Sequence, residues 1–140
     1  MAEVVLRSAV SDAGLSSQVE VESAGTGDWH LGQQMNSGAR AALSRRGYDG
    51  SEHRARQISP PWFERLDLVL AMDGMNLQDL RRMSGEPSRV LLFGGIGGGG
   101  EVPDPYGGSL ADFDRVLAQI EAAAPVIAAH LAEVLSARPA

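Results

Sequence analysis

The sequence predicts a single α/β domain built on an open parallel sheet with helices on both faces. Segments with helical periodicity alternate with short apolar runs, which is the pattern of strands joined by crossover helices. One of these runs, LDLVLAM at 66–72, is apolar almost throughout, as expected of a strand that is covered on both faces. The length of 140 residues suits one core, and no internal repeat or linker divides it. We therefore expect one domain over residues 1–140.

The first half of the chain predicts two helices and a strand. Helices are expected at 2–13 and 37–46, because apolar side chains recur there at helical spacing and a glycine follows each segment. Between them, QVEVES at 18–23 alternates valine with polar residues and predicts a short strand. That strand leads into a loop containing two glycines at 24–27.

The second half continues the alternation of helices and strands. In order, the pattern predicts a brief helix at 60–65, a strand at 66–72, a helix at 75–83, a strand at 89–93 and a final helix from 109. The final helix opens on a capping-box pattern and carries one long apolar stripe. Because a helix comes first and only three strands are predicted, we expect that the pattern lacks the first, central strand of the sheet.

The composition excludes several classes of function. A net charge of −6 and a pI near 4.9 argue against nucleic-acid or anionic-membrane partners. There is no lysine for a Schiff base or a Walker loop, and no cysteine for a disulfide, a thiolate metal site or a thiol nucleophile. The three histidines lie far apart in the sequence, so no metal site is expected. We also see no apolar run long enough for a signal peptide or a membrane span, which predicts a cytoplasmic protein.

The glycine-rich stretch GGIGGGG matches the letters of a dinucleotide-binding motif through Gly95, Gly97 and Gly100. Such a motif must open a helix whose N-terminus receives the pyrophosphate. Pro103 and Pro105 follow instead, so no helix can begin there. We predict a flexible connector rather than a nucleotide site.

The stretch EVPDPYGG holds Asp104 between Pro103 and Pro105, which leaves its backbone few conformations. Taken alone, these residue types favour a surface turn. However, the stretch follows the last predicted strand, and ligands of open parallel sheets bind beyond the carboxyl ends of the strands. The loop that contains Trp29 is expected to open at the same edge. A pocket walled by Trp29 and Tyr106, with Asp104 as a proton donor, is the functional hypothesis, although Trp29 could also be a lid on the core.

Taken together, the motifs resemble the low-molecular-weight protein-tyrosine phosphatases over nearly the whole chain. The matching stretches are MAEVVLR, VESAGTGDWHLG, ARQI, DLVLAMDGMN and EVPDPYGG, followed by a helix with DFDRV. The resemblance implies a flavodoxin-like three-layer sandwich, of the phosphotyrosine phosphatase I type, with a four-stranded parallel sheet. It also implies hydrolysis of phosphotyrosine in proteins, or of small aryl phosphates, without a metal or cofactor.

The resemblance also implies roles for particular residues. Asp104 corresponds to the general acid that protonates the leaving tyrosyl oxygen, and then to the base that activates water against the phosphocysteine. Trp29 and Tyr106 correspond to the aromatic walls of the substrate site. Ser23 corresponds to a residue that braces the phosphate loop by hydrogen bonding.

Glu3 and His53 resemble a buried pair that supports the phosphate loop, although a purely structural salt bridge is an equally good interpretation. Three positions depart from the family pattern. Gly107 stands where a second aromatic is usual, and Asn36 and Gly38 replace a usual Asp and Arg. These departures predict an altered specificity or a relaxed constraint.

The family's first strand leads into a phosphate loop of cysteine, five residues and Arg-Ser-Pro, and a sequence like MAE follows directly. We therefore expect Met1 to be an internal residue of a longer, active phosphatase, and residues 1–140 to be inactive without the cysteine. One alternative is a phosphatase-like binding protein without catalysis. Another is a related arsenate reductase, whose chemistry needs several cysteines. The arginine-only, alanine-rich composition suits a GC-rich bacterial genome.

Overall fold

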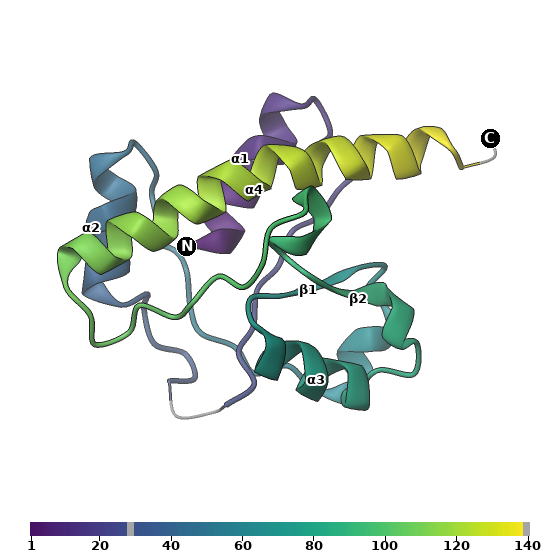
Figure 1. Ribbon diagram of the computed structural model, residues 1–140, viewed down its shortest axis with the longest axis horizontal. Helices are drawn as coiled ribbons and strands as arrows, with labels where there is room; N and C mark the ends of the chain where they lie inside the picture. The colour runs from purple at the N-terminus through teal and green to yellow at the C-terminus, as the bar shows by residue number, and fades with distance from the viewer. Residues whose placement is uncertain (28–29, 139–140) are drawn as a thin grey trace.

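The structure, a computed structural model, describes residues 1–27 and 30–138. A parallel sheet lies between a layer of three helices and a fourth helix on its other face (Figure 1). The elements are α1 (Ala2–Asp12), α2 (Ser37–Arg45), η1 (Pro60–Glu64), β1 (Val69–Ala71), α3 (Gly74–Met83), η2 (Pro87–Arg89), β2 (Val90–Leu92), η3 (Gly95–Gly97) and α4 (Leu110–Ser136). The predicted α/β class with an open parallel sheet is confirmed.

The sheet separates two hydrophobic clusters because side chains alternate between its faces. β1 pairs with β2 in parallel, with Val69 opposite Val90. Val69 and Ala71 face the cluster that contains Leu80 of α3, whereas Leu70 packs against the larger cluster beneath α1, α2 and α4. Both faces of β1 are therefore covered, as its apolar sequence predicts.

The long helix α4 contributes more buried residues to the larger cluster than any other helix or strand. Its buried stripe, Phe113, Val116, Leu117, Ile120, Ala124, Ile127 and Ala128, packs against α1 and α2. Pro125 lies within the helix without ending it. By length and composition α4 would also suit a membrane span, since one 18-residue window has a mean hydropathy of 1.2. Of that window, 33% is buried inside the structure. The expectation that the chain contains no such segment was therefore wrong, although the packing of the stripe is that of a core helix.

The strand predicted at 18–23 is not formed within the described part of the chain. These residues have no regular secondary structure. Just after them, Gly25 forms an isolated parallel bridge with Gln57. A strand requires a hydrogen-bonding neighbour, and alternation in one segment cannot provide one. The prediction of a short strand at this position was wrong.

The glycine-rich stretch is a compact turn rather than the flexible connector that we predicted. The backbone N–H of Gly99 donates to the carbonyl of Gly94 at 3.0 Å, and Gly98 has a φ of +81°, in the left-handed region. Ile96 between them packs against the larger cluster. Consecutive glycines let the chain fold tightly onto itself, and the apolar anchor holds that turn beneath α4.

Candidate active site

The acid loop, which we define as residues 101–109, connects β2 and η3 to α4. Asp104 is exposed, and its Oδ1 accepts a hydrogen bond from the backbone N–H of Tyr106 at 3.0 Å. This short ring of atoms is an Asx turn, which orients the carboxylate through its own loop. Gly107 follows with a φ of +79°, a conformation that a second aromatic residue would adopt only with strain.

The acid loop meets the loop that follows residues 18–23. The ring of His30 lies 5.7 Å from the ring of Tyr106 between centroids, at an interplanar angle of 48°. His30 Nδ1 is also 3.0 Å from Oε1 of Gln33, a contact within its own loop. The two loops thus share one edge of the molecule, and Tyr106 remains 65% exposed beside that contact. Trp29 lies outside the described residues.

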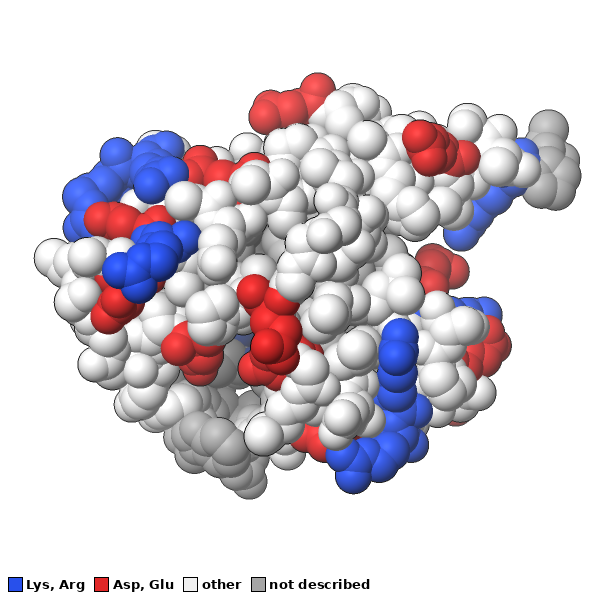
Figure 2. All heavy atoms as spheres, viewed as in Figure 1, with Lys and Arg blue, Asp and Glu red and all other residues white. Residues whose placement is uncertain are grey.

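The C-terminal end of the acid loop is held by the first turn of α4. The Ser109 side chain accepts from the backbone N–H of Asp112, and Asp112 Oδ2 accepts from the backbone N–H of Ser109 at 2.9 Å. This reciprocal capping box satisfies two backbone donors at once. Figure 2 shows acidic side chains following the chain that leads into α4 on this face.

The capping box predicts a pH dependence at this end of the loop. The hydrogen bond from the Ser109 backbone lowers the pKa of Asp112 below its usual value of 3.8. Because the folded pKa is the lower one, the stabilisation is complete above the unfolded pKa and is lost as pH falls through the folded pKa. We expect the Ser109 amide resonance to titrate below about pH 3.8. In Asp112→Asn that titration should vanish, and identical titration of both proteins would contradict the assignment.

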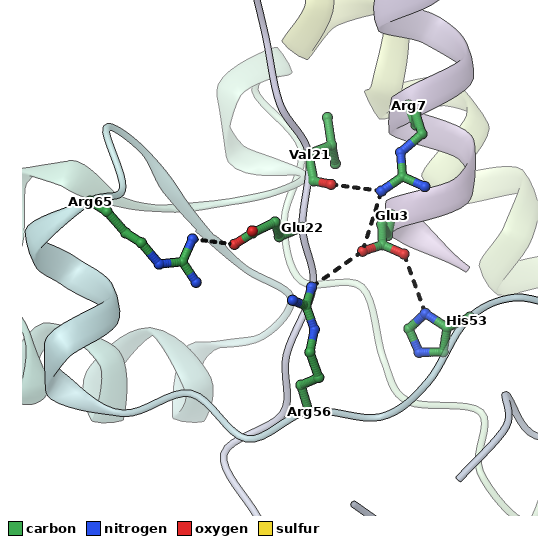
Figure 3. Close-up of polar contacts among 7 residues, drawn as sticks. All are labelled: Glu3, Arg7, Val21, Glu22, His53, Arg56 and Arg65. Carbon is green, nitrogen blue, oxygen red and sulfur yellow. Dashed lines mark hydrogen bonds and ion pairs between the residues drawn. The ribbon is translucent and has the colours of Figure 1, made fainter. Parts of the chain in front are cut away.

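Glu3 is the centre of a second polar cluster, at the first turn of α1. Its side chain is only 11% exposed and lies 3.3 Å from His53 Nδ1, 3.7 Å from Arg7 and 3.8 Å from Arg56. Arg7 also donates to the carbonyl of Val21 at 2.8 Å. Figure 3 shows this carboxylate between α1 and the facing chain. The cluster therefore ties α1 to two other segments.

No motif in the sequence indicates a role for the arginines of this cluster. Arg56 lies over the ring of Trp62, with its guanidinium carbon 5.1 Å from the centroid, and Arg65 lies over the same ring at 4.7 Å. Arg65 in turn pairs with Glu22 at 2.6 Å. The stretch ARQI contains Arg56, but only the tertiary structure shows what the guanidinium contacts.

Ser23 follows Glu22 in the chain, and its hydroxyl is buried without a hydrogen-bond partner among the described residues. Buried hydroxyl groups are normally paired, since an unpaired one costs desolvation energy. The hydroxyl is thus available to a group other than the residues described.

The site is an exposed edge rather than a closed pocket. Two surface hollows of about 460 and 440 Å³ lie along α2 and along α1, and Asp104 lines neither of them. Among the described residues, no group of three or more His, Asp or Glu side chains could hold a metal ion. The chemistry available at this edge is proton transfer by a carboxylate beside aromatic rings.

Comparison with known proteins decides the family. The profile described as low molecular weight phosphotyrosine protein phosphatase matches residues 1–137. The chain belongs to this phosphatase family. A relative from Streptomyces coelicolor named low molecular weight protein-tyrosine-phosphatase is 41% identical over 148 residues, which cover 100% of this chain and 90% of the relative. Low molecular weight protein-tyrosine phosphatase A of Mycobacterium tuberculosis is 35% identical over 130 residues, with coverage of 89% and 78%.

Solved structures agree with this assignment. A protein tyrosine phosphatase from Entamoeba histolytica, crystallised with Hepes in its active site, superposes with a TM-score of 0.87 at 29% identity, covering 94% of this chain and 87% of that one. YfkJ from Bacillus subtilis superposes with a TM-score of 0.86 at 28% identity, covering 94% and 85%. The protein is therefore a member of the protein-tyrosine phosphatases, which are hydrolases that act on phosphotyrosine.

Proposed function

We propose that this chain supplies the proton-transfer half of a phosphotyrosine phosphatase site, with Asp104 as general acid and then general base. Tyr106, together with Trp29, forms the wall for the substrate ring. The observation that carries this proposal is the contact between His30 and Tyr106, which brings the two loops to one edge beside Asp104. The substrate class is phosphotyrosine in a protein or a small aryl phosphate.

The proposed chemistry assigns two steps to Asp104. As phosphate transfers to a thiolate nucleophile, the protonated carboxyl gives its proton to the departing phenolate oxygen. The resulting carboxylate then removes a proton from the water that attacks the phosphocysteine, which releases phosphate and restores the acid. Pro103 and Pro105 support both steps because they restrict the backbone that carries this carboxyl.

The second polar cluster has a supporting role in this proposal. Glu3 and His53 tie the first turn of α1 to the facing loop, and the unpaired hydroxyl of Ser23 is suited to bracing a phosphate loop. A helix N-terminus favours anions, so rigid support at this place serves phosphate binding. None of these three residues takes part in the bond changes themselves.

Residues 1–140 by themselves should not turn over substrate, because they contain no thiol nucleophile. Enzymes accelerate phosphate-monoester hydrolysis by up to ~10²¹, whereas a positioned general acid supplies only ~10²–10⁴. We expect purified chain to release no nitrophenol from p-nitrophenyl phosphate in the presence of a chelator. Metal-independent turnover that copurifies with the chain would refute this part of the proposal.

The absence of cysteine also favours a second candidate, a phosphatase-like protein that binds phosphotyrosine without hydrolysing it. The two candidates differ in a direct binding measurement on residues 1–140. Saturable calorimetric binding of a phosphotyrosine peptide, abolished by dephosphorylating the peptide, would favour the binding protein. If this chain does not bind the peptide, the result would favour the catalytic candidate, in which the phosphate loop lies outside residues 1–140.

A further inference from the structure

The acid loop begins at the N-terminus of α3, where Glu101 makes a contact that none of the motifs suggests. Its Oε1 accepts a hydrogen bond from the backbone N–H of Gly74 at 2.6 Å. Gly74 is the first residue of α3, and its N–H has no partner inside the helix. Asp73, the N-cap, accepts instead from Asn76 at 2.8 Å, so the two carboxylates satisfy different donors.

The local chemistry suits this contact. A carboxylate at a helix N-terminus is stabilised by the helix dipole, and a hydrogen bond to a charged acceptor is stronger than a neutral one. A Cβ at position 74 would lie 2.9 Å from the Glu101 Oε1, so a larger residue there would require the Glu101 carboxylate to shift. Glycine therefore lets the carboxylate approach the backbone closely.

The next residue fixes the loop at a second point. The backbone N–H of Val102 donates to the carbonyl of Met72 at 2.7 Å, and the Val102 side chain is only 4% exposed in the larger cluster. Two consecutive residues thus join the start of the acid loop to the turn between β1 and α3. Pro103 and Pro105 restrict the backbone from there to Asp104, so these two anchored residues together set where Asp104 lies.

We propose that Glu101 is a positioning residue for Asp104. It binds the N-terminal end of the acid loop to the N-terminus of α3, as the capping box binds the C-terminal end of the loop to α4. Asp104 is then presented between the N-termini of α3 and α4. This inference rests on the proposed role of Asp104, because a positioned carboxylate matters only if that carboxylate reacts.

Amide hydrogen exchange on residues 1–140 tests the clamp without requiring activity. In Glu101→Ala, we expect the amides of Gly74 and Tyr106 to exchange about tenfold faster, the effect of losing one hydrogen bond to a charged group. The Tyr106 amide reports on Asp104, since it donates to Asp104 Oδ1. Glu101→Gln should restore most of the protection, because its amide oxygen can still accept.

A matched variant separates positioning from general loss of stability. Glu133→Ala removes an exposed carboxylate on α4 and should leave the exchange of both amides unchanged. Faster exchange of all core amides in Glu101→Ala, including those of α1, would overturn the proposal in favour of a stabilising role. Unchanged exchange at Tyr106 would overturn it as well.

A kinetic measurement distinguishes this inference from the proposed function. It uses an extended protein, in which a strand and a phosphate loop of the family pattern precede Met1. There Glu101→Ala should lower kcat about tenfold with KM unchanged, and Glu101→Gln should recover most of it. A loss confined to KM would contradict positioning of the acid. If Asp104→Asn retained full activity, the proposed function would fail even where the exchange pattern held.

Discussion

Replacing Asp104 by Asn in the extended protein is expected to lower kcat for phenyl phosphate by about 10²–10⁴, the contribution of a positioned general acid. The asparagine amide is too weak an acid to protonate the departing phenolate, although its oxygen can still accept from Tyr106. The loss should be smaller for p-nitrophenyl phosphate, because nitrophenolate is a weaker base and leaves with less protonation. Steady-state kinetics with both substrates measures the difference.

The matched control is Asp12→Asn, at the carboxyl end of α1. It makes the same chemical change at an exposed position and should leave kcat within twofold, as is usual for surface substitutions. Equal losses in the two variants would mean that net charge, rather than proton transfer, controls the rate. A similar loss for both leaving groups in Asp104→Asn would also contradict the general-acid assignment.

The largest effect on stability is expected from Gly94→Ala, in the glycine-rich turn. Gly94 has φ −74° and ψ −20°, so alanine suits the backbone angles. However, the new Cβ would overlap the carbonyl oxygen of Gly100, which belongs to the backbone and cannot rotate away. Overpacking of this kind costs about 1–3 kcal/mol in the free energy of unfolding. Urea unfolding followed by circular dichroism gives this value.

Gly85→Ala provides the control, because no atom lies within 4 Å of a Cβ at that position. There the substitution only restricts the unfolded chain, so we expect a change between zero and about 1 kcal/mol in the stabilising direction. If Gly94→Ala were as stable as Gly85→Ala, the turn would be the flexible connector that the sequence suggested.

Two of the helices that the sequence predicted correctly, α2 and α4, begin at local capping signals. α2 begins after Asn36, whose side chain caps the Gly38 amide, and α4 begins at the Ser109 capping box. Each signal lies within a few residues and acts through the backbone beside it. The strand at 18–23 failed for the opposite reason, because its alternation says nothing about which segment would pair with it.

The residues of the candidate site were predictable from the sequence, whereas the contacts between them were not. The Pro-Asp-Pro stretch and the resemblance identified Asp104 and Tyr106 by residue type and order. Nothing local indicated that His30 would reach Tyr106, or that Glu101 would bind Gly74. Those partners come from different loops, which only the order of the strands brings together.

By itself, then, the sequence determined the family, the stiffness of the backbone at Asp104 and the lack of a thiol. Only the tertiary structure decided which groups hold the acid loop and which ring lies beside Tyr106. The physical reason is that backbone preference and capping are set by neighbours in the chain. Contacts between distant segments depend instead on how the sheet and helices pack, and that packing is a property of the whole chain.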